Sequence, residues 1–242
     1  MADDLRIVTA VEAFSEPVAP AAVLVDKPGG ITSFGVVKKV RWALDVKKVG
    51  HAGTLDPMAT GLLIVLVGRD ATRQQDRFMG LPKTYTATVR LGQTTPTYDA
   101  DADVDAEADA SGVTDADVEA ALGGFRGEIL QRPPIYSAIK RGGERLYKKA
   151  RRGETVEIEP RPTTVYAFDV VDRRGDDLDV RVECSKGTYV RSLAHDLGQA
   201  LGVGGHLVAL RREAIGPFQA SEAFALDALV EAARGPEAVR PA

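Results

Sequence analysis

Residues 50–67, GHAGTLDPMATGLLIVLV, set a glycine-rich stretch directly in front of six consecutive apolar residues. The apolar run, residues 62–67, has the length of a buried strand. The glycines before it argue against an ordinary helix and predict a constrained loop. Pro57 fixes its own backbone and biases Asp56 away from helical geometry. The sequence therefore predicts a short carboxylate that is held in a loop in front of a core strand.

The side chain of Asp56 suits nucleophilic or general-base chemistry. An aspartate ordinarily has a pKa of about 3.9, so it is ionised at neutral pH without help from a metal ion or a neighbouring base. The alternative is a turn aspartate whose carboxylate accepts hydrogen bonds from nearby backbone N–H groups. The loop alone leaves both interpretations open, and sequence elsewhere in the chain has to decide between them.

Strand and helix patterns surround this loop. Strands are predicted at residues 23–25, 62–67, 84–91 and 178–184, and helices from Thr32 or Ser33, from residue 115 and from just after Thr188. Residues 84–91 alternate between apolar and polar side chains, and Tyr85 begins the apolar face. Strands interspersed with helices, with neighbouring strands joined by short connections, favour the α+β class over a doubly wound sheet.

Composition limits the class of protein. A chain of 242 residues with 44% hydrophobic content can bury a sizeable core. It has no apolar window of about eighteen residues, and its acidic start lacks the features of a secretory signal, so we expect a cytoplasmic protein without a membrane partner. One cysteine excludes an intrachain disulfide, and three widely spaced histidines form no zinc-type cluster. We therefore expect no metal.

Charge is segregated along the chain, although the net charge is only −4. Residues 99–119 hold nine acids and no base, whereas residues 132–152 hold eight bases and one acid. A second basic cluster precedes the aspartate loop and consists of Lys38, Lys39, Arg41, Lys47 and Lys48. Either basic cluster alone fits a solvated face. Together, flanking a held carboxylate, they suggest contacts with nucleic-acid phosphates.

Several blocks of this sequence resemble those of one enzyme family. Residues 50–63 resemble the catalytic motif of the TruB family of tRNA pseudouridine synthases, in which the aspartate of a Leu-Asp-Pro run is catalytic. Further similar blocks are VDKPGGITS (25–33), KTYTA (83–87), RLG (90–92), RPPIYSAIK (132–140), CSKGTYVRSL (184–193) and LRR (210–212). One Leu-Asp-Pro would be a weak signal. Several blocks in family order across residues 23–218 make an accidental similarity improbable.

The resemblance implies an isomerase with a mixed, largely antiparallel central sheet, flanked by helices and loops around a cleft. Its reaction breaks the N1–C1′ bond of uridine and remakes the bond from C5, which requires no cofactor. Asp56 could attack C1′, attack C6 or abstract the C2′ proton, and all three routes stay open. The implied substrate is uridine 55 in the T arm of tRNA, whose base the enzyme must flip out of its stack.

Three residues are expected beside the target nucleotide with Asp56. Tyr85 matches the active-site tyrosine of the family and could stack on the extruded base, a contact worth about 1–3 kcal/mol. Its alternative is a core aromatic. Arg191 could hold Asp56 ionised, although by itself it fits an exposed helix arginine. Tyr189 could move the proton from C5.

The resemblance implies further contacts with RNA. The family places a histidine near the nucleotide at the position of His51, which could insert into the RNA stack or support the extruded conformation. A lone histidine is more often structural. Leu210 resembles an apolar residue beside the pocket. Weaker candidates for contacts with RNA or with loops are Lys27, Arg73, Lys140, Arg141, Lys148 and Lys149.

The chain is expected to divide into three parts and to act as a monomer. Composition marks residues 1–22 as an N-terminal tail or arm outside the core. By resemblance, residues 23–218 form the catalytic domain, with a basic segment at about 126–152 inserted to grip tRNA. Residues 219–242 leave room for a short extension, and no complete C-terminal RNA-binding PUA domain is expected there.

Three other functions stay open on the sequence. A synthase for another uridine-containing loop would use the same motif. A noncatalytic RNA-binding or RNA-folding protein fits the basic segments but does not require Asp56. A carboxylate hydrolase acting on sugars would want a second catalytic carboxylate, and no other one has a comparable local signature.

Overall fold

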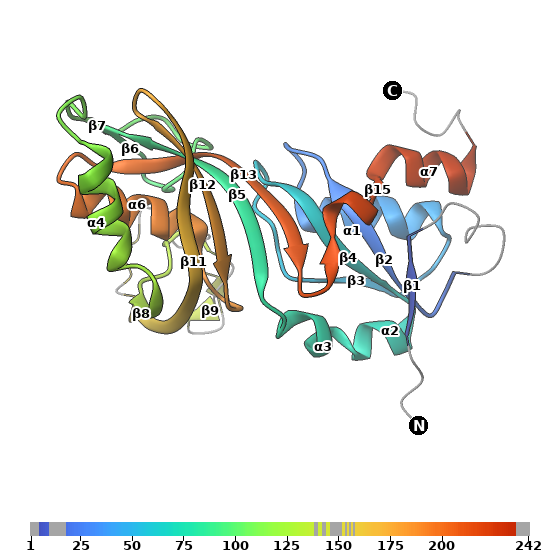
Figure 1. The fold of residues 1–242 in the computed structure, drawn as a ribbon. Coiled ribbons are helices and arrows are strands. Elements are labelled where there is room, and N and C mark those ends of the chain that lie inside the picture. The colour runs from blue at the N-terminus through green and yellow to red at the C-terminus, as the bar shows by residue number, and fades with distance from the viewer. Residues whose placement is uncertain are drawn as a thin grey trace. The chain divides into compact units, whose positions relative to one another are not determined.

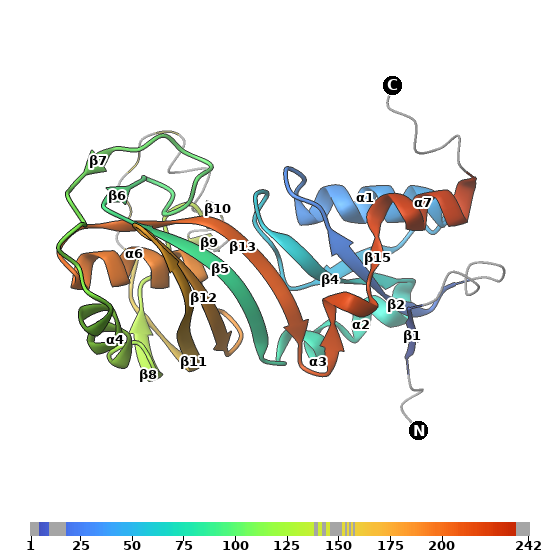
Figure 2. The ribbon, with the colours of Figure 1, turned by 45° about the horizontal axis from the view of Figure 1, so that its top comes forward.

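The computed structural model describes residues 5–9, 18–137, 140–141, 144–145, 152, 154, 156 and 158–235. The chain forms two compact units: unit 1 comprises Met1–Tyr85 and Arg211–Ala242, and unit 2 comprises Thr86–Leu210. Figure 1 and Figure 2 show the elements of both units from two directions. Among the helices that the structure describes, none is long and apolar enough to cross a membrane.

Unit 1 is built on a central pair of antiparallel strands, β2 (Ala21–Lys27) and β4 (Thr60–Val67). The other strands of this unit are β1 (Arg6–Val8), β3 (Val49–Ala52), β14 (Phe218–Gln219) and β15 (Phe224–Ala225). The first residues of β5 (Lys83–Leu91) and the last residues of β13 (Gly205–Ile215) also belong to it. β1 and β15 pair parallel with β2, whereas β4 pairs antiparallel with β3 and parallel with β13. β14 pairs antiparallel with β13. The predicted buried strand at residues 62–67 is confirmed as the main part of β4.

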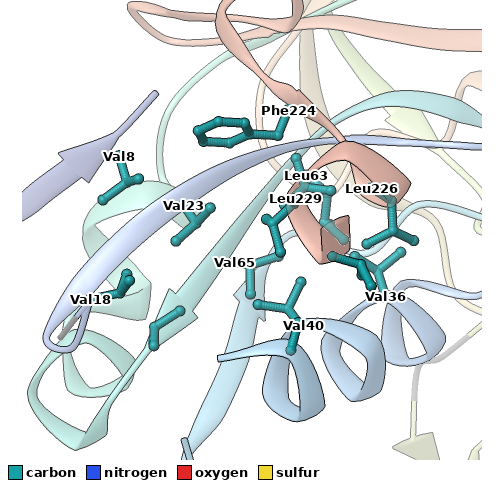
Figure 3. Close-up of a cluster of buried hydrophobic side chains, with 14 of the residues drawn as sticks. Val8, Val18, Val23, Val36, Val40, Leu63, Val65, Phe224, Leu226 and Leu229 are labelled. Carbon is teal, nitrogen blue, oxygen red and sulfur yellow. The ribbon is translucent and has the colours of Figure 1, made fainter. Parts of the chain in front are cut away.

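Helices cover both faces of this sheet. They are α1 (Ser33–Ala43), α2 (Arg69–Arg73), α3 (Gln75–Met79), the 3-10 helix η2 (Ala220–Glu222) and α7 (Leu226–Arg234). Figure 3 shows side chains of β2 and β4 meeting those of α1 and α7, among them Val23, Val65, Val40 and Leu229. Alternate residues of the same strands face a second cluster with α2, α3 and η2. Because both faces are covered, β4 is a continuous apolar run rather than an alternating one.

Part of the predicted N-terminal arm belongs to the core of unit 1. Strand β1 pairs with β2, and Val8 is buried in the same cluster as Val23. Leu5 and Val18 are also buried. The expectation that residues 1–22 lie outside the core is therefore wrong for these positions. A three-residue strand is too short to show a period in the sequence, whereas pairing with an existing strand stabilises it.

Unit 2 contains a sheet with the strand order β5 (Lys83–Leu91), β12 (Asp177–Cys184), β11 (Arg161–Arg174) and β8 (Gly127–Gln131). β11 pairs antiparallel with β12 and with β8. Helix α4 (Asp115–Gly123) packs against α6 (Val190–Ala200) and β11. Two further antiparallel pairs are β6 (Gln93–Thr94) with β7 (Ala106–Glu107) and β9 (Lys140–Arg141) with β10 (Glu144–Arg145). The expected α+β class with a mixed sheet is confirmed.

The three predicted helix starts are confirmed, and two of them have a side-chain cap. Thr32 accepts a hydrogen bond from the backbone N–H of Gly35 at the start of α1, at 3.0 Å. Thr114 forms a capping box with Asp117 at the start of α4. Helix α6 begins at Val190, directly after Tyr189. Capping satisfies backbone N–H groups that would otherwise lack partners in the first turn, so these sequence signals are local and reliable.

Candidate active site

Asp56 lies in the loop of residues 53–59 between β3 and β4, and its side chain is half-buried. Two glycines shape the ends of this loop. Gly53 and Gly61 have φ angles of 85° and 96°, a region that residues with a side chain rarely adopt. A Cβ atom on Gly61 would also lie 2.3 Å from the carbonyl oxygen of Arg212. Glycine is therefore required at position 61 both by the backbone and by its neighbour.

Ser33 holds the residue in front of Asp56. Its Oγ accepts a hydrogen bond from the backbone N–H of Leu55 at 2.8 Å and donates one to the carbonyl oxygen of Leu55 at 2.9 Å. Both side chains are buried, so water does not compete for these bonds. Ser33 is the first residue of α1, and this contact fastens the loop to the start of that helix.

Lys27 holds the residue behind Asp56. Its ammonium group donates to the carbonyl oxygens of Pro28, Ile31 and Pro57 at 2.8, 2.7 and 3.0 Å. The side chain is fully buried at the end of β2. Of the two contacts expected for Lys27, this geometry favours the contact with the loop over a contact with an RNA phosphate. The backbone is thus gripped on both sides of Asp56.

Arg212 ties the loop to the sheet. Its Nε donates to the carbonyl oxygen of Leu62 at 2.7 Å, and its Nη2 donates to that of Gly53 at 3.0 Å. The side chain is 1% exposed. Neither Arg212 nor Ser33 was predicted as a site residue, although both lie in family-like blocks. Their contacts join positions that are far apart in the sequence, and only the fold reveals them.

Replacing Lys27 with methionine is expected to lower the free energy of unfolding by about 2–3 kcal/mol and to lower kcat more than it raises KM. Methionine fills a similar volume but offers no N–H to the three carbonyl oxygens, and burying a carbonyl with fewer donors costs free energy. The loop behind Asp56 then loses one of its restraints, which disturbs positioning more than binding. Urea unfolding and steady-state kinetics would measure the two effects.

Lys47→Met is the matched control, because Lys47 is exposed and close in sequence to the loop. It should leave the free energy of unfolding and kcat nearly unchanged, whereas loss of a phosphate contact by this lysine would raise only KM. Equal unfolding midpoints and equal kcat for Lys27→Met and the control would contradict the role given to Lys27.

His51 lies on β3 and is half-buried. Burial lowers the pKa of its imidazole below the ordinary value, and the nearby positive charge of Arg212 lowers this pKa further. The ring is therefore neutral at neutral pH. Its Nδ1 is buried without a hydrogen-bond partner among the described residues, and the backbone oxygen of His51 accepts from Gln75 Nε2 at 3.0 Å. The structure places His51 just ahead of the loop that carries Asp56.

A basic pocket lies beside β3 in unit 1. It is open, has a volume of about 470 Å³, and is lined by Lys48, Val49, Gly50, Arg69, Thr72, Arg73 and Gln75. Arg73 is exposed and lies 3.3 Å from the carboxylate of Asp70, a surface ion pair that contributes little stability. Three cationic side chains around one hollow suit a phosphate group.

Tyr85 lies on β5 in unit 1, and its side chain is 8% exposed. Residues 85, 87, 89 and 91 are all buried, so the predicted apolar face of this strand is confirmed. The stacking of Tyr85 on an extruded base stays a prediction.

In unit 2, Gln131 fixes the backbone of Tyr189. Its side-chain oxygen accepts a hydrogen bond from the N–H of Tyr189 at 2.8 Å, and its Nε2 donates to the carbonyl oxygen of Tyr189 at 3.0 Å. Gln131 is buried and Tyr189 is half-buried. A glutamine at the end of β8 carries no local signal in the sequence, so this contact was not predicted.

Arg191 is in the first turn of α6 and is buried, so the alternative of an exposed helix arginine is wrong. Its Nη1 lies 3.1 Å from the carboxylate of Asp99, and the two side chains are 5% and 3% exposed. Arg191 also donates to the carbonyl oxygens of Thr97 and Tyr136 at 2.9 and 3.1 Å. Asp99 begins the acidic segment and was not predicted as a site residue.

The remaining predicted residues have the following places. Leu210 is a buried residue of β13. Lys140 and Arg141 form β9, and their side chains lie outside the described part of the structure, as do Lys148 and Lys149 entirely. In unit 1, Lys27 lies at the loop of Asp56. In unit 2, Tyr189 directly precedes α6 and Arg191 lies in its first turn. The predicted pairing of Arg191 with Asp56 stays a prediction.

Two family models match the chain. The first, described as TruB family pseudouridylate synthase (N terminal domain), matches residues 41–190. The second, described as tRNA pseudouridylate synthase B C-terminal domain, matches residues 191–238.

Curated relatives are similar over most of this chain. A protein of Corynebacterium efficiens named tRNA pseudouridine synthase B is 52% identical over 216 residues, which cover 88% of this chain and 72% of the relative. A protein of the same name from Mycobacteroides abscessus is 48% identical over 225 residues, covering 90% of this chain and 75% of the relative.

Solved structures share the fold. A chain in the crystal structure of a Cbf5-Nop10-Gar1 complex matches with a TM-score of 0.70 and 32% identity, covering 95% of this chain and 59% of that chain. A chain in the structure of an H/ACA RNP bound to a substrate RNA containing 2′-deoxyuridine matches with a TM-score of 0.65 and 31% identity. That match covers 87% of this chain and 52% of the other, so this chain spans about half the length of that neighbour.

Proposed function

Because this chain belongs to the TruB family and isomerises uridine to pseudouridine in tRNA, we propose that its target is uridine 55 of the T arm and that Asp56 is the catalytic carboxylate. The observation that carries the proposal is the grip on both neighbours of Asp56, by Ser33 in front and by Lys27 behind. Because its backbone is fixed, the carboxylate is held in one position relative to the bound ribose and base. Less entropy is then lost on reaching the transition state, which raises the rate.

The chemistry makes three demands on the site. The N1–C1′ bond has to break, the free base has to turn, and C5 has to bond to C1′ while its proton leaves. Asp56 serves the first step by attacking C1′, by attacking C6 or by taking the C2′ proton. Each route requires an ionised oxygen close to the ribose, and a half-buried position leaves the side chain accessible to the nucleotide.

Other residues are assigned by chemistry to the remaining demands. Tyr85 stacks on the uracil and keeps it in the site while it is detached. Tyr189 transfers the proton of C5, directly or through one water molecule. Arg191 maintains the charge of Asp56, and Leu210 packs beside the base. His51, whose ring is neutral, takes the place of the flipped nucleotide in the RNA stack.

RNA binding is assigned to two basic regions. The pocket formed by Lys48, Arg69 and Arg73 binds a phosphate near the target nucleotide. The basic segment of residues 126–152 grips the T-arm stem-loop, and it is described only in part. We propose that the T-arm stem-loop is sufficient for recognition and that the enzyme works as a monomer in the cytoplasm.

A T-arm stem-loop with C5-tritiated uridine tests the substrate assignment, because forming the C1′–C5 bond releases the tritium. The wild-type enzyme is expected to release tritium from this RNA at least about tenfold faster than from an anticodon stem-loop with a uridine of the same label. Filter binding measures the affinity for both RNAs in parallel. Faster release from the anticodon stem-loop would show that the target is a uridine outside the T arm. Tight binding of the T-arm stem-loop without any tritium release would favour a noncatalytic RNA-binding protein.

A further inference from the structure

Helix α1 exposes two aromatic side chains and several cations on its outer surface. Phe34 and Trp42 are 57% and 52% exposed, which is unusual for side chains of this size. Lys38 and Arg41 are exposed between them. Positions 34, 38 and 41 share one face of a helix, and Trp42 lies next to Lys38. We call these four residues the α1 stripe.

Both rings of the α1 stripe are held by cations. The ammonium group of Lys38 lies 5.1 Å from the centroid of the Phe34 ring. The guanidinium of Arg234, on α7, lies 5.4 Å from the centroid of the Trp42 ring and donates to the carbonyl oxygen of Trp42 at 2.5 Å. Helices α1 and α7 lie side by side in both Figure 1 and Figure 2. These contacts limit the motion of the rings, so the rings lose less conformational entropy when a ligand stacks on them.

The charge of the α1 stripe is available to a ligand. Within the described part of the chain, neither Lys38 nor Arg41 forms an ion pair. The neighbouring Lys39 pairs with Asp227 of α7 at 3.5 Å, and this pair lies beside the stripe. Interfaces between proteins are depleted of lysine, whereas RNA combines phosphates that bind cations with bases that stack on aromatic rings.

The α1 stripe begins at the loop of Asp56. Phe34 follows Ser33, whose hydroxyl holds both backbone groups of Leu55. From Phe34 to Trp42 the stripe runs about 12 Å along the helix axis, which is the length of roughly two nucleotides. An RNA strand whose uridine reaches Asp56 can therefore continue along α1.

We propose that the α1 stripe binds the RNA strand that flanks the target uridine, with bases stacked on Phe34 and Trp42 and phosphates bound to Lys38 and Arg41. This proposal rests on the proposed function, since it takes Asp56 as the point where the target nucleotide enters. It adds an RNA contact surface on α1 to the loop, the pocket and the basic segment.

Trp42 provides a direct test, because it is the one tryptophan of the chain. Titration of the wild type with the T-arm stem-loop is expected to quench its fluorescence and to protect it from acrylamide, with the same Kd as filter binding gives. Trp42→Ala and Phe34→Ala are each expected to raise Kd about tenfold. The matched control is Tyr166→Ala, which removes an aromatic ring that is 57% exposed on β11, and it should leave Kd unchanged.

The double variant Lys38→Gln, Arg41→Gln tests the phosphate contacts and keeps both aromatic rings, although it also removes the cation beside Phe34. It is expected to reduce the slope of log Kd against log salt concentration by about 2, because two phosphates lose their cations. Circular dichroism and thermal unfolding show whether each variant is folded. The salt slope also keeps the proposal falsifiable if Trp42→Ala does not fold.

The same experiments separate failure of the proposed function from failure of the α1-stripe proposal. If the wild type binds the stem-loop but releases no tritium, the proposed function fails. If the wild type releases tritium while its Trp42 emission, the Kd values of the ring variants and the salt slope all stay unchanged, the α1 stripe does not bind RNA. Sedimentation that shows RNA-free self-association of the wild type, lost in Trp42→Ala, would overturn the proposal in favour of a contact between two copies.

Discussion

Asp56→Asn is expected to slow tritium release from the T-arm stem-loop by a factor of roughly 10⁴ or more, while Kd for the RNA changes less than about threefold. The amide has nearly the shape of the carboxylate, so Ser33 and Lys27 still hold the loop. It carries no charge, and it is too weak a nucleophile and base for any of the three routes. Single-turnover release with excess enzyme and filter binding measure the two quantities.

Asp76→Asn is the control for this experiment, because Asp76 is an exposed carboxylate on α3 in the same unit. Its release rate should equal that of the wild type. Release by Asp56→Asn within about tenfold of the control would show that the carboxylate charge of Asp56 is not essential, and it would reopen the interpretation of Asp56 as a turn residue. If Asp56→Asn instead lost affinity for the stem-loop, Asp56 would be a residue that binds the RNA.

Asp99→Asn is expected to have the largest effect on stability, lowering the free energy of unfolding by about 3 kcal/mol. Its carboxylate lies 3.1 Å from the guanidinium of Arg191, and both side chains are almost fully buried. Removing one charge of a buried pair leaves the other in surroundings that solvate it poorly. The unfolding temperature should fall by about 6–12 °C for a chain of this size. Activity should fall as well, because Arg191 is also an expected active-site residue.

Asp70→Asn makes the same substitution in an exposed pair. Asp70 lies 3.3 Å from Arg73, and both side chains are about 70% exposed. Exposed pairs contribute little, so the unfolding temperature should change by no more than about 2 °C. If Asp99→Asn and Asp70→Asn proved equally mild, the buried pair would contribute no more than a surface pair.

Local signals in the sequence predicted the elements that hold Asp56. Glycine and proline predicted the loop, the apolar run at residues 62–67 predicted β4, and Thr32 or Ser33 as a cap predicted the start of α1. Each of these signals acts within a few residues, and the structure confirms all three.

The contacts that hold the site could not be read from the sequence. Arg212 reaches Gly53, Gln131 reaches Tyr189 and Arg191 reaches Asp99 across large separations along the chain. A buried arginine or lysine also looks like a surface residue until its partners are known, as Lys27 demonstrates. Strand β11 was missed because register shifts in its pairing with β12 disturb the alternation of buried and exposed residues.

The burial of Lys27 has a consequence for covalent modification of the enzyme. In the folded protein its ammonium group donates hydrogen bonds to three carbonyl oxygens. An acetylating enzyme or an amine-reactive metabolite therefore cannot reach this nitrogen. Such chemistry reaches Lys27 only before folding is complete or during rare openings of the loop. Exposed lysines such as Lys47 stay open to this chemistry throughout, whereas Lys27 is protected for as long as the loop of Asp56 keeps its folded structure.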